Sequence, residues 1–68
     1  MTSFEIRYPD IFVQLSGTDG NAYSILGKVN RALREAGHGD KVEQFVAEAT
    51  AGDYYHLLAT AMRWVDCG

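Results

Sequence analysis

Cysteine is almost missing from this sequence, and long apolar runs are missing altogether. With a single cysteine, Cys67, the chain cannot form an internal disulfide, which argues against a disulfide-stabilised secreted protein. No apolar run approaches the roughly 20 residues needed to cross a bilayer. The N-terminal segment also lacks the basic start and apolar core of a secretory signal. We therefore expect a cytoplasmic protein that makes no membrane contact.

Positive charge is also scarce, and it is concentrated in one segment. The 68 residues carry 6 Lys and Arg against 9 Asp and Glu, a net charge of −3. Residues 21–36 are basic, with Lys28, Arg31 and Arg34 against Glu35, whereas the rest of the chain is acidic. The overall balance disfavours a dedicated nucleic-acid binder, which usually has an excess of cations.

The length and the apolar content predict one small folded unit over residues 1–68. At 47% hydrophobic residues, the chain is too apolar for intrinsic disorder. It is too short to hold separate catalytic and binding domains.

Residues 1–16 are predicted to be extended, because apolar and polar residues alternate on both sides of Pro9. A proline followed by aspartate favours a turn, so a short β-hairpin is the favoured interpretation. The alternative is one strand from Asp10 to Ser16 preceded by an irregular arm, since Pro9 also interrupts ladder hydrogen bonding.

Three helices are predicted, over residues 21–36, 40–51 and 53–66. Apolar residues recur at helical spacing through residues 21–36, with Asn21 as the N-cap and Gly37 as the stop. Gly52 ends the second helix, and Asp53 caps the third. The predicted fold class is α+β: a hairpin, or one strand with an arm, packed on three helices in the order ββααα.

The predicted third helix has a narrow polar side, made of His56, Thr60 and Arg63. A helix that is apolar over most of its circumference must be covered over most of it, and this chain offers little to cover it with. Tyr, Trp and Met are enriched where proteins meet. The sequence therefore predicts a partner interface on this helix, with an ordinary core as the alternative; its members are Tyr55, Ala59, Met62 and Trp64.

The basic segment suggests a second candidate surface for an anion or an acidic partner. The alternative is a solvated helix face. Gly27 adds to the functional interpretation, because a glycine inside a helix often marks a close approach of another backbone. The candidate residues are Tyr23, Lys28, Arg31 and Arg34.

Residues that carry chemistry are few and scattered. Among His38, His56 and Cys67, no pair has the short spacing of a zinc site. The loop over residues 17–21 precedes a helix, but it lacks the lysine of a phosphate-binding loop and is better explained as a tight turn. We expect no enzyme, no metal and no cofactor.

Five segments carry a resemblance to a known family: Tyr8–Ile11, Val13–Ala22, Ile25–Val29, Gly52–Leu58 and Trp64–Val65. They resemble a family of small proteins encoded by bacteriophages, prophages and actinobacterial genomes, for which no activity is established. Tyr55 departs from the aspartate expected at that position of the family. The resemblance implies a setting in mobile genetic elements, where small acidic proteins bind host machinery, including defence systems.

Together these observations predict a non-catalytic protein-binding module, derived from a phage or mobile element. It would act as an accessory factor or inhibitor of host machinery, with an anti-defence role such as CRISPR inhibition among the expectations. The expected partner is a host protein or a second copy in a homodimer. The alternative is a small nucleic-acid or nucleotide binder that uses the basic face of residues 21–36.

Overall fold

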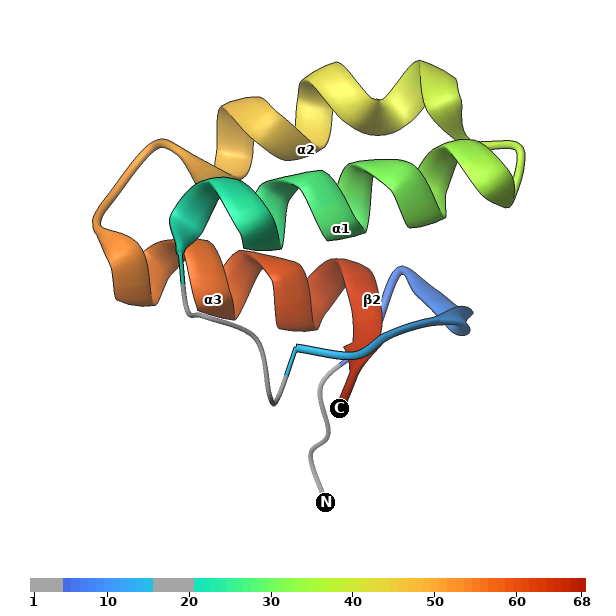
Figure 1. Cartoon of the computed structure of the whole chain (residues 1–68), viewed down its shortest axis with the longest axis horizontal. Helices are drawn as coiled ribbons and strands as arrows, with labels where there is room; N and C mark the ends of the chain where they lie inside the picture. The colour runs from blue at the N-terminus through green and yellow to red at the C-terminus, as the bar shows by residue number, and fades with distance from the viewer. Residues whose placement is uncertain (1–4, 16–20) are drawn as a thin grey trace.

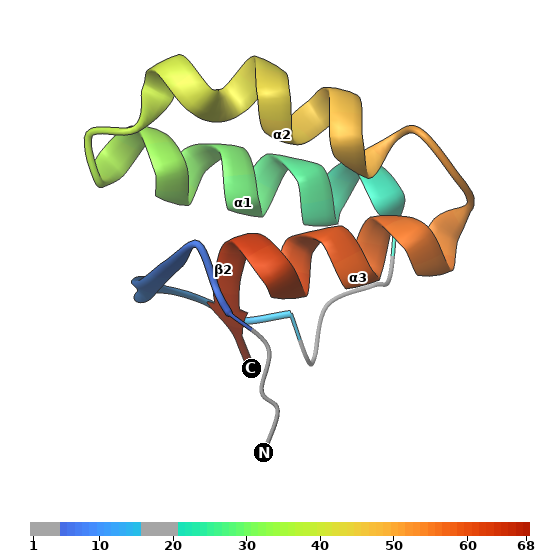
Figure 2. The ribbon, with the colours of Figure 1, turned by 180° about the vertical axis from the view of Figure 1, so that it is seen from behind.

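The computed structural model describes residues 5–15 and 21–68. Its elements are β1 (Tyr8–Val13), α1 (Ala22–Glu35), the short 3-10 helix η1 (Gly39–Lys41), α2 (Val42–Ala49), α3 (Tyr54–Trp64) and β2 (Val65–Cys67). The three α-helices lie side by side, and the strands lie at the C-terminal end of α3 (Figures 1 and 2). The predicted α+β class is confirmed.

The strands form a two-stranded parallel sheet between the two ends of the described chain. Tyr8 lies opposite Val65, and Val13 lies opposite Cys67. The predicted hairpin is therefore wrong for the described residues, since both sides of Pro9 belong to the single strand β1. Pro9 sits where the register is irregular, between Tyr8 and Phe12. An irregularity of this kind tolerates a residue without a backbone N–H.

The third helix ends earlier than predicted. Residues 53–66 were expected to be helical, but α3 stops at Trp64, and Val65 begins β2. Gly68 extends the pairing, because its N–H donates to the Val13 carbonyl at 3.0 Å and its carbonyl accepts from the Leu15 N–H at 2.8 Å. The physical reason is that β1 lies beside Val65 and pairs with it, and a buried β-branched residue favours a strand over a helix.

The ends of α1 follow the sequence prediction closely. The Asn21 side chain accepts a hydrogen bond from the Tyr23 N–H at 2.7 Å and so caps the helix. At the other end, Gly37 has a φ of +87°, and the His38 N–H donates to the Leu33 carbonyl at 2.7 Å. This glycine-dependent C-terminal motif turns the chain toward η1 and α2.

One hydrophobic core joins all three helices to both strands. α1 contributes Ile25, Val29 and Leu33, one helical turn apart, and packs against both α2 and α3. Thr60 is the one buried polar residue among the described residues. Within the described ranges, no helix is both long and apolar enough to span a membrane. The buried apolar side chains are Val13, Ile25, Val29, Leu33, Phe45, Ala49, Leu57, Ala61, Trp64 and Val65.

Candidate functional site

The side of α3 that faces away from the core is apolar. Tyr55 is 77% exposed and Met62 is 56% exposed. Leu58 and Ala59 lie between them and are half-buried. At 100° per residue these four positions fall within an arc of roughly 100°, so they form one stripe along the helix. We call this stripe the outer face of α3.

Trp64 does not belong to this surface, which corrects the sequence prediction. Its side chain is 2% exposed. The indole Nε1–H donates to Glu48 Oε1 at 3.0 Å, and the ring meets Phe45 edge-on with centroids 5.4 Å apart. On the other side, the Arg7 guanidinium lies 4.3 Å from the ring centroid. Trp64 is therefore a core residue that ties α2 and the segment before β1 to α3.

The predicted polar side of α3 is partly inside the molecule. Thr60 is buried, and its hydroxyl donates to the His56 carbonyl at 2.8 Å. The His56 ring donates from Nε2 to the Glu48 carbonyl at 2.7 Å. Both polar groups therefore satisfy the chain's own carbonyls, while Tyr55 and Met62 face outward.

A small apolar depression lies at the Met62 end of the outer face. It has a volume of about 220 Å³ and is lined by Ile6, Ala59, Met62 and Arg63. Arg63 supplies the only charge in the lining, and within the described residues it forms no ion pair. A hollow of this size suits one side chain rather than a drug-sized molecule, for which pockets of about 300–1,000 Å³ are usual.

A second depression of about 310 Å³ lies where the start of α1 meets the end of α2 and the start of α3. Its polar lining residues include Thr50 and Asp53. The Thr50 hydroxyl already donates to the Val46 carbonyl, and the Asp53 carboxylate already accepts from the His56 N–H. These two groups therefore serve the helix ends and are not presented to a ligand.

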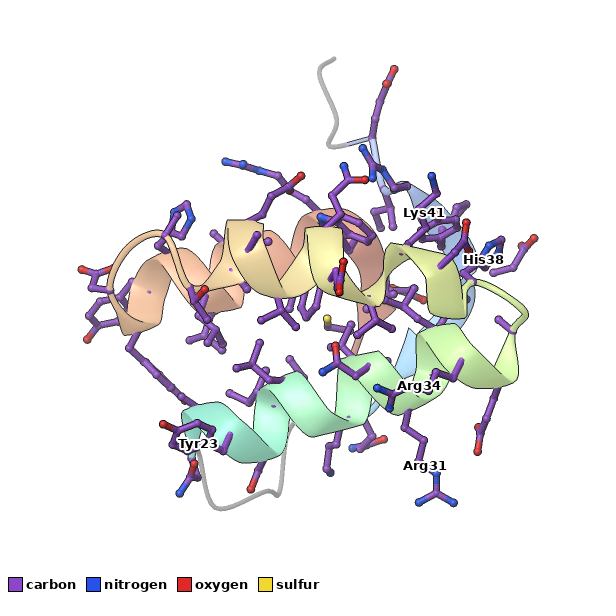
Figure 3. All side chains as sticks on the ribbon, turned by 90° about the horizontal axis from the view of Figure 1, so that it is seen from above. Tyr23, Arg31, Arg34, His38 and Lys41 are labelled. Carbon is purple, nitrogen blue, oxygen red and sulfur yellow. The ribbon has the colours of Figure 1, made fainter. Side chains whose placement is uncertain are left out.

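The residues of the predicted basic face do not form one cluster. Tyr23, 84% exposed, lies at one end of α1, whereas Arg31 and Arg34 lie toward the other end (Figure 3). Arg31 is paired with Glu35 through a 3.1 Å Nε–Oε2 contact. The Lys28 ammonium donates to the Gln14 carbonyl at 3.2 Å.

The close approach predicted at Gly27 is not found in the described part of the chain. A Cβ built on Gly27 meets no atom within 4 Å, and the residue is exposed. The structure instead places His38 and Lys41, which the sequence analysis did not assign to the basic face, at the Arg34 end of α1 (Figure 3). There the centroid of the His38 ring lies 4.3 Å from the centroid of the Tyr8 ring. Sequence reasoning missed this juxtaposition because Tyr8 and His38 lie far apart in the sequence and meet only through tertiary packing.

The sequence analysis also missed three residues that belong to the outer face of α3 or lie beside it: Leu58, Ile6 and Arg63. Leu58 had a usable signal, since it follows Tyr55 by three residues and precedes Met62 by four. Ile6 had none, because the segment that carries it reaches α3 only in the folded chain. There the Arg7 N–H donates to the Arg63 carbonyl at 2.8 Å.

Cys67 has the character of a packed thiol. It is half-buried, and its Sγ lies 3.6 Å from the Val65 carbonyl oxygen. Burial, and then the neighbouring Asp66 carboxylate, raise the pKa of the Cys67 thiol. An activated nucleophile needs the opposite shift. Among the residues that the structure describes, no group of three or more His, Cys, Asp or Glu is placed to hold a metal ion.

No family model, curated protein or solved structure matches this chain. The resemblance to phage, prophage and actinobacterial proteins therefore stays a prediction. The loop over residues 17–20 lies outside the described residues, so the turn predicted there also stays a prediction.

Proposed function

We propose that the protein is a non-catalytic protein-binding module that engages its partner through the outer face of α3. The observation that supports this best is the exposure of Tyr55 and Met62 on a helix whose opposite side fills the core. Residues at i, i+3, i+4 and i+7 are the anchors by which a helix face contacts another protein. Met suits such a surface because its flexible thioether adapts to varied shapes.

The proposal includes the setting implied by the family resemblance. In that setting the partner is a host protein, and the module acts as an accessory factor or inhibitor, for example against a defence system such as CRISPR. A short chain suits this role, because binding a partner requires one presented surface and no assembled catalytic site.

Co-purification from a host lysate, read by mass spectrometry, tests the proposed function. Tyr55→Ser and Met62→Ser are each expected to lose a partner that the wild-type protein retains. Tyr23→Ser is the matched control, because Tyr23 is 84% exposed, more than the 77% of Tyr55, but lies on α1. Partners that bind all three variants as well as the wild type would place the interface elsewhere and contradict the proposal.

A further inference from the structure

The outer face of α3 carries both a projecting side chain and a depression that suits one side chain. Tyr55 projects from the first turn of the helix and is 77% exposed. The depression of about 220 Å³ lies at the other end of the face, beside Met62. A surface that holds a projection and a matching recess is able to pair with a second copy of itself, because a twofold axis makes each copy fill the recess of the other.

Tyr55 and the depression lie on the same flank of the outer face. At about 100° per residue, the lining residues of α3 run from about 20° on one side of Tyr55, at Met62, to about 80° on the other side, at Arg63. An antiparallel pair of α3 helices with its twofold axis between Leu58 and Ala59 brings equivalent flanks together. Tyr55 of each copy then lies opposite Met62 of the other and projects into its depression. At the centre, Leu58 packs against the small side chain of Ala59.

The flank on which the two copies meet carries both signs of charge in each copy. Arg63 is the cation, and Glu48 from α2 reaches the same flank through its contacts with His56 and Trp64. The hydrogen bond from Trp64, and to a smaller extent the charge of Arg63, lower the pKa of Glu48, so its exposed carboxylate is ionised at neutral pH. Pairing thus gathers two guanidinium groups and two carboxylates, whose charges compensate, whereas a strongly acidic or basic partner adds an unmatched charge there.

Two features limit the strength of such a pair. Each copy carries a net charge of −3, which opposes association, although salt at about 0.15 M screens charges that lie more than about 8 Å apart. The outer face also spans only two helical turns, and this is less surface than the about 1,200–2,000 Å² that stable complexes bury. A pair of this kind is therefore weak and reversible.

We infer that the protein forms a weak, reversible dimer in which the outer faces of two α3 helices pack antiparallel, with Tyr55 of each copy in the depression beside Met62 of the other. The Arg63 guanidinium borders that depression and would donate a hydrogen bond to the Tyr55 hydroxyl oxygen. The inference goes beyond the proposed function, because it says what covers the outer face before a host protein binds. The host protein would then displace the second copy.

Sedimentation equilibrium measures the dimer directly. Between about 5 and about 500 µM, the average mass of the wild type is expected to rise from that of the monomer toward that of the dimer, with a Kd of about 10–100 µM. Tyr55→Ser and Met62→Ser are each expected to weaken association about tenfold or more. Tyr23→Ser is the matched control, because it removes an exposed tyrosine from α1, and it is expected to change the Kd less than about twofold.

Disulfide cross-linking tests the antiparallel register. The twofold axis lies beside Ala59, so Ala59→Cys meets its counterpart in the second copy at a separation that a disulfide spans, whereas Tyr23→Cys on α1 does not. Both variants are made together with Cys67→Ser, which removes the single native thiol. Ala59→Cys is expected to cross-link about tenfold faster than Tyr23→Cys, because pairing raises the effective thiol concentration. Equal rates would overturn the arrangement.

Salt dependence separates this dimer from one held by ion pairs. Since like net charges oppose the pairing of two apolar faces, raising NaCl from about 0.05 M to about 0.5 M is expected to strengthen association about twofold or more. Association that weakens with salt would overturn the apolar contact. A wild type that stays monomeric at about 500 µM, or a dimer that Tyr55→Ser or Met62→Ser leaves unchanged, would overturn the inference as a whole. The proposed function fails separately, in the co-purification from a host lysate.

Discussion

At the scale of single residues, Trp64 shows how a small chain buries a large aromatic side chain. Its ring is covered by Phe45 from α2, by Tyr8 from β1 with centroids 5.9 Å apart, and by the Arg7 guanidinium. The indole N–H, which is costly to bury unpaired, donates to Glu48. Covering Trp64 uses side chains from distant parts of the chain, whereas within residues 5–15 and 21–68 Tyr55 and Met62 remain largely exposed.

The Glu48–Trp64 contact predicts a specific pH dependence. The hydrogen bond from Trp64, and then the one from Gln44, lower the pKa of Glu48 below its ordinary value of 4.5. The ionised carboxylate therefore stabilises the fold above that ordinary value, and this contribution is lost as the pH falls through the lowered pKa. Because Glu48 is exposed, we expect the contribution to be below about 1 kcal/mol.

Glu48→Gln isolates this contribution, because a glutamine oxygen still accepts from Trp64 but cannot be ionised. Urea unfolding at about pH 6 and about pH 3 is expected to show a larger loss of stability in the wild type than in the variant. Equal losses in the two proteins would show that the ionisation of Glu48 does not contribute to folding.

Gly37 and Gly27 form a matched pair for alanine substitution. Gly37 has a φ of +87°, a conformation that strains a residue with a Cβ, so Gly37→Ala is expected to destabilise by about 1 kcal/mol. Gly27 lies inside α1 with open space around a built Cβ, so Gly27→Ala is expected to stabilise by about 0.5–1 kcal/mol. Thermal unfolding of both variants measures these effects, and shifts in the same direction would contradict this account.

At the scale of elements, α1 was predictable because its signals are local. The apolar period, the Asn21 cap and the Gly37 stop all lie within one stretch of sequence, and the structure uses each of them. The boundary between α3 and β2 was not predictable in the same way. Trp64 and Val65 continue an apolar pattern that suits a helix, and the strand forms only because β1 lies beside it.

The alternative function, in which the basic face of α1 binds a nucleic acid or a nucleotide, leads to a prediction of its own. Arg31 and Arg34 are both exposed, but Arg31 is paired with Glu35, and Lys28 is bonded to a backbone carbonyl. We therefore expect only weak binding to a fluorescent oligonucleotide at low salt, with a further loss on Arg31→Ala and Arg34→Ala. Tight binding that these changes leave intact would refute this expectation.

At the scale of the whole molecule, the fold is closed by pairing the two ends of the described chain. A parallel pair needs a crossover connection, and here α1, α2 and α3 together provide it. The hairpin expectation failed because the local turn signal at Pro9 says nothing about a strand more than 50 residues away. For the same reason, the helical pattern could identify Tyr55 and Met62 but could not place Ile6 or bury Trp64.

The central claim is that Tyr55 and Met62 are presented for binding and are not required for folding. Urea unfolding of the double variant Tyr55→Ser/Met62→Ser tests it most directly, with Leu57→Ser as the buried control on the same helix. We predict that the double variant loses less than about 1 kcal/mol, while Leu57→Ser loses more than about 2 kcal/mol. A loss in the double variant as large as that of Leu57→Ser would show that both side chains belong to the core, and would contradict the account.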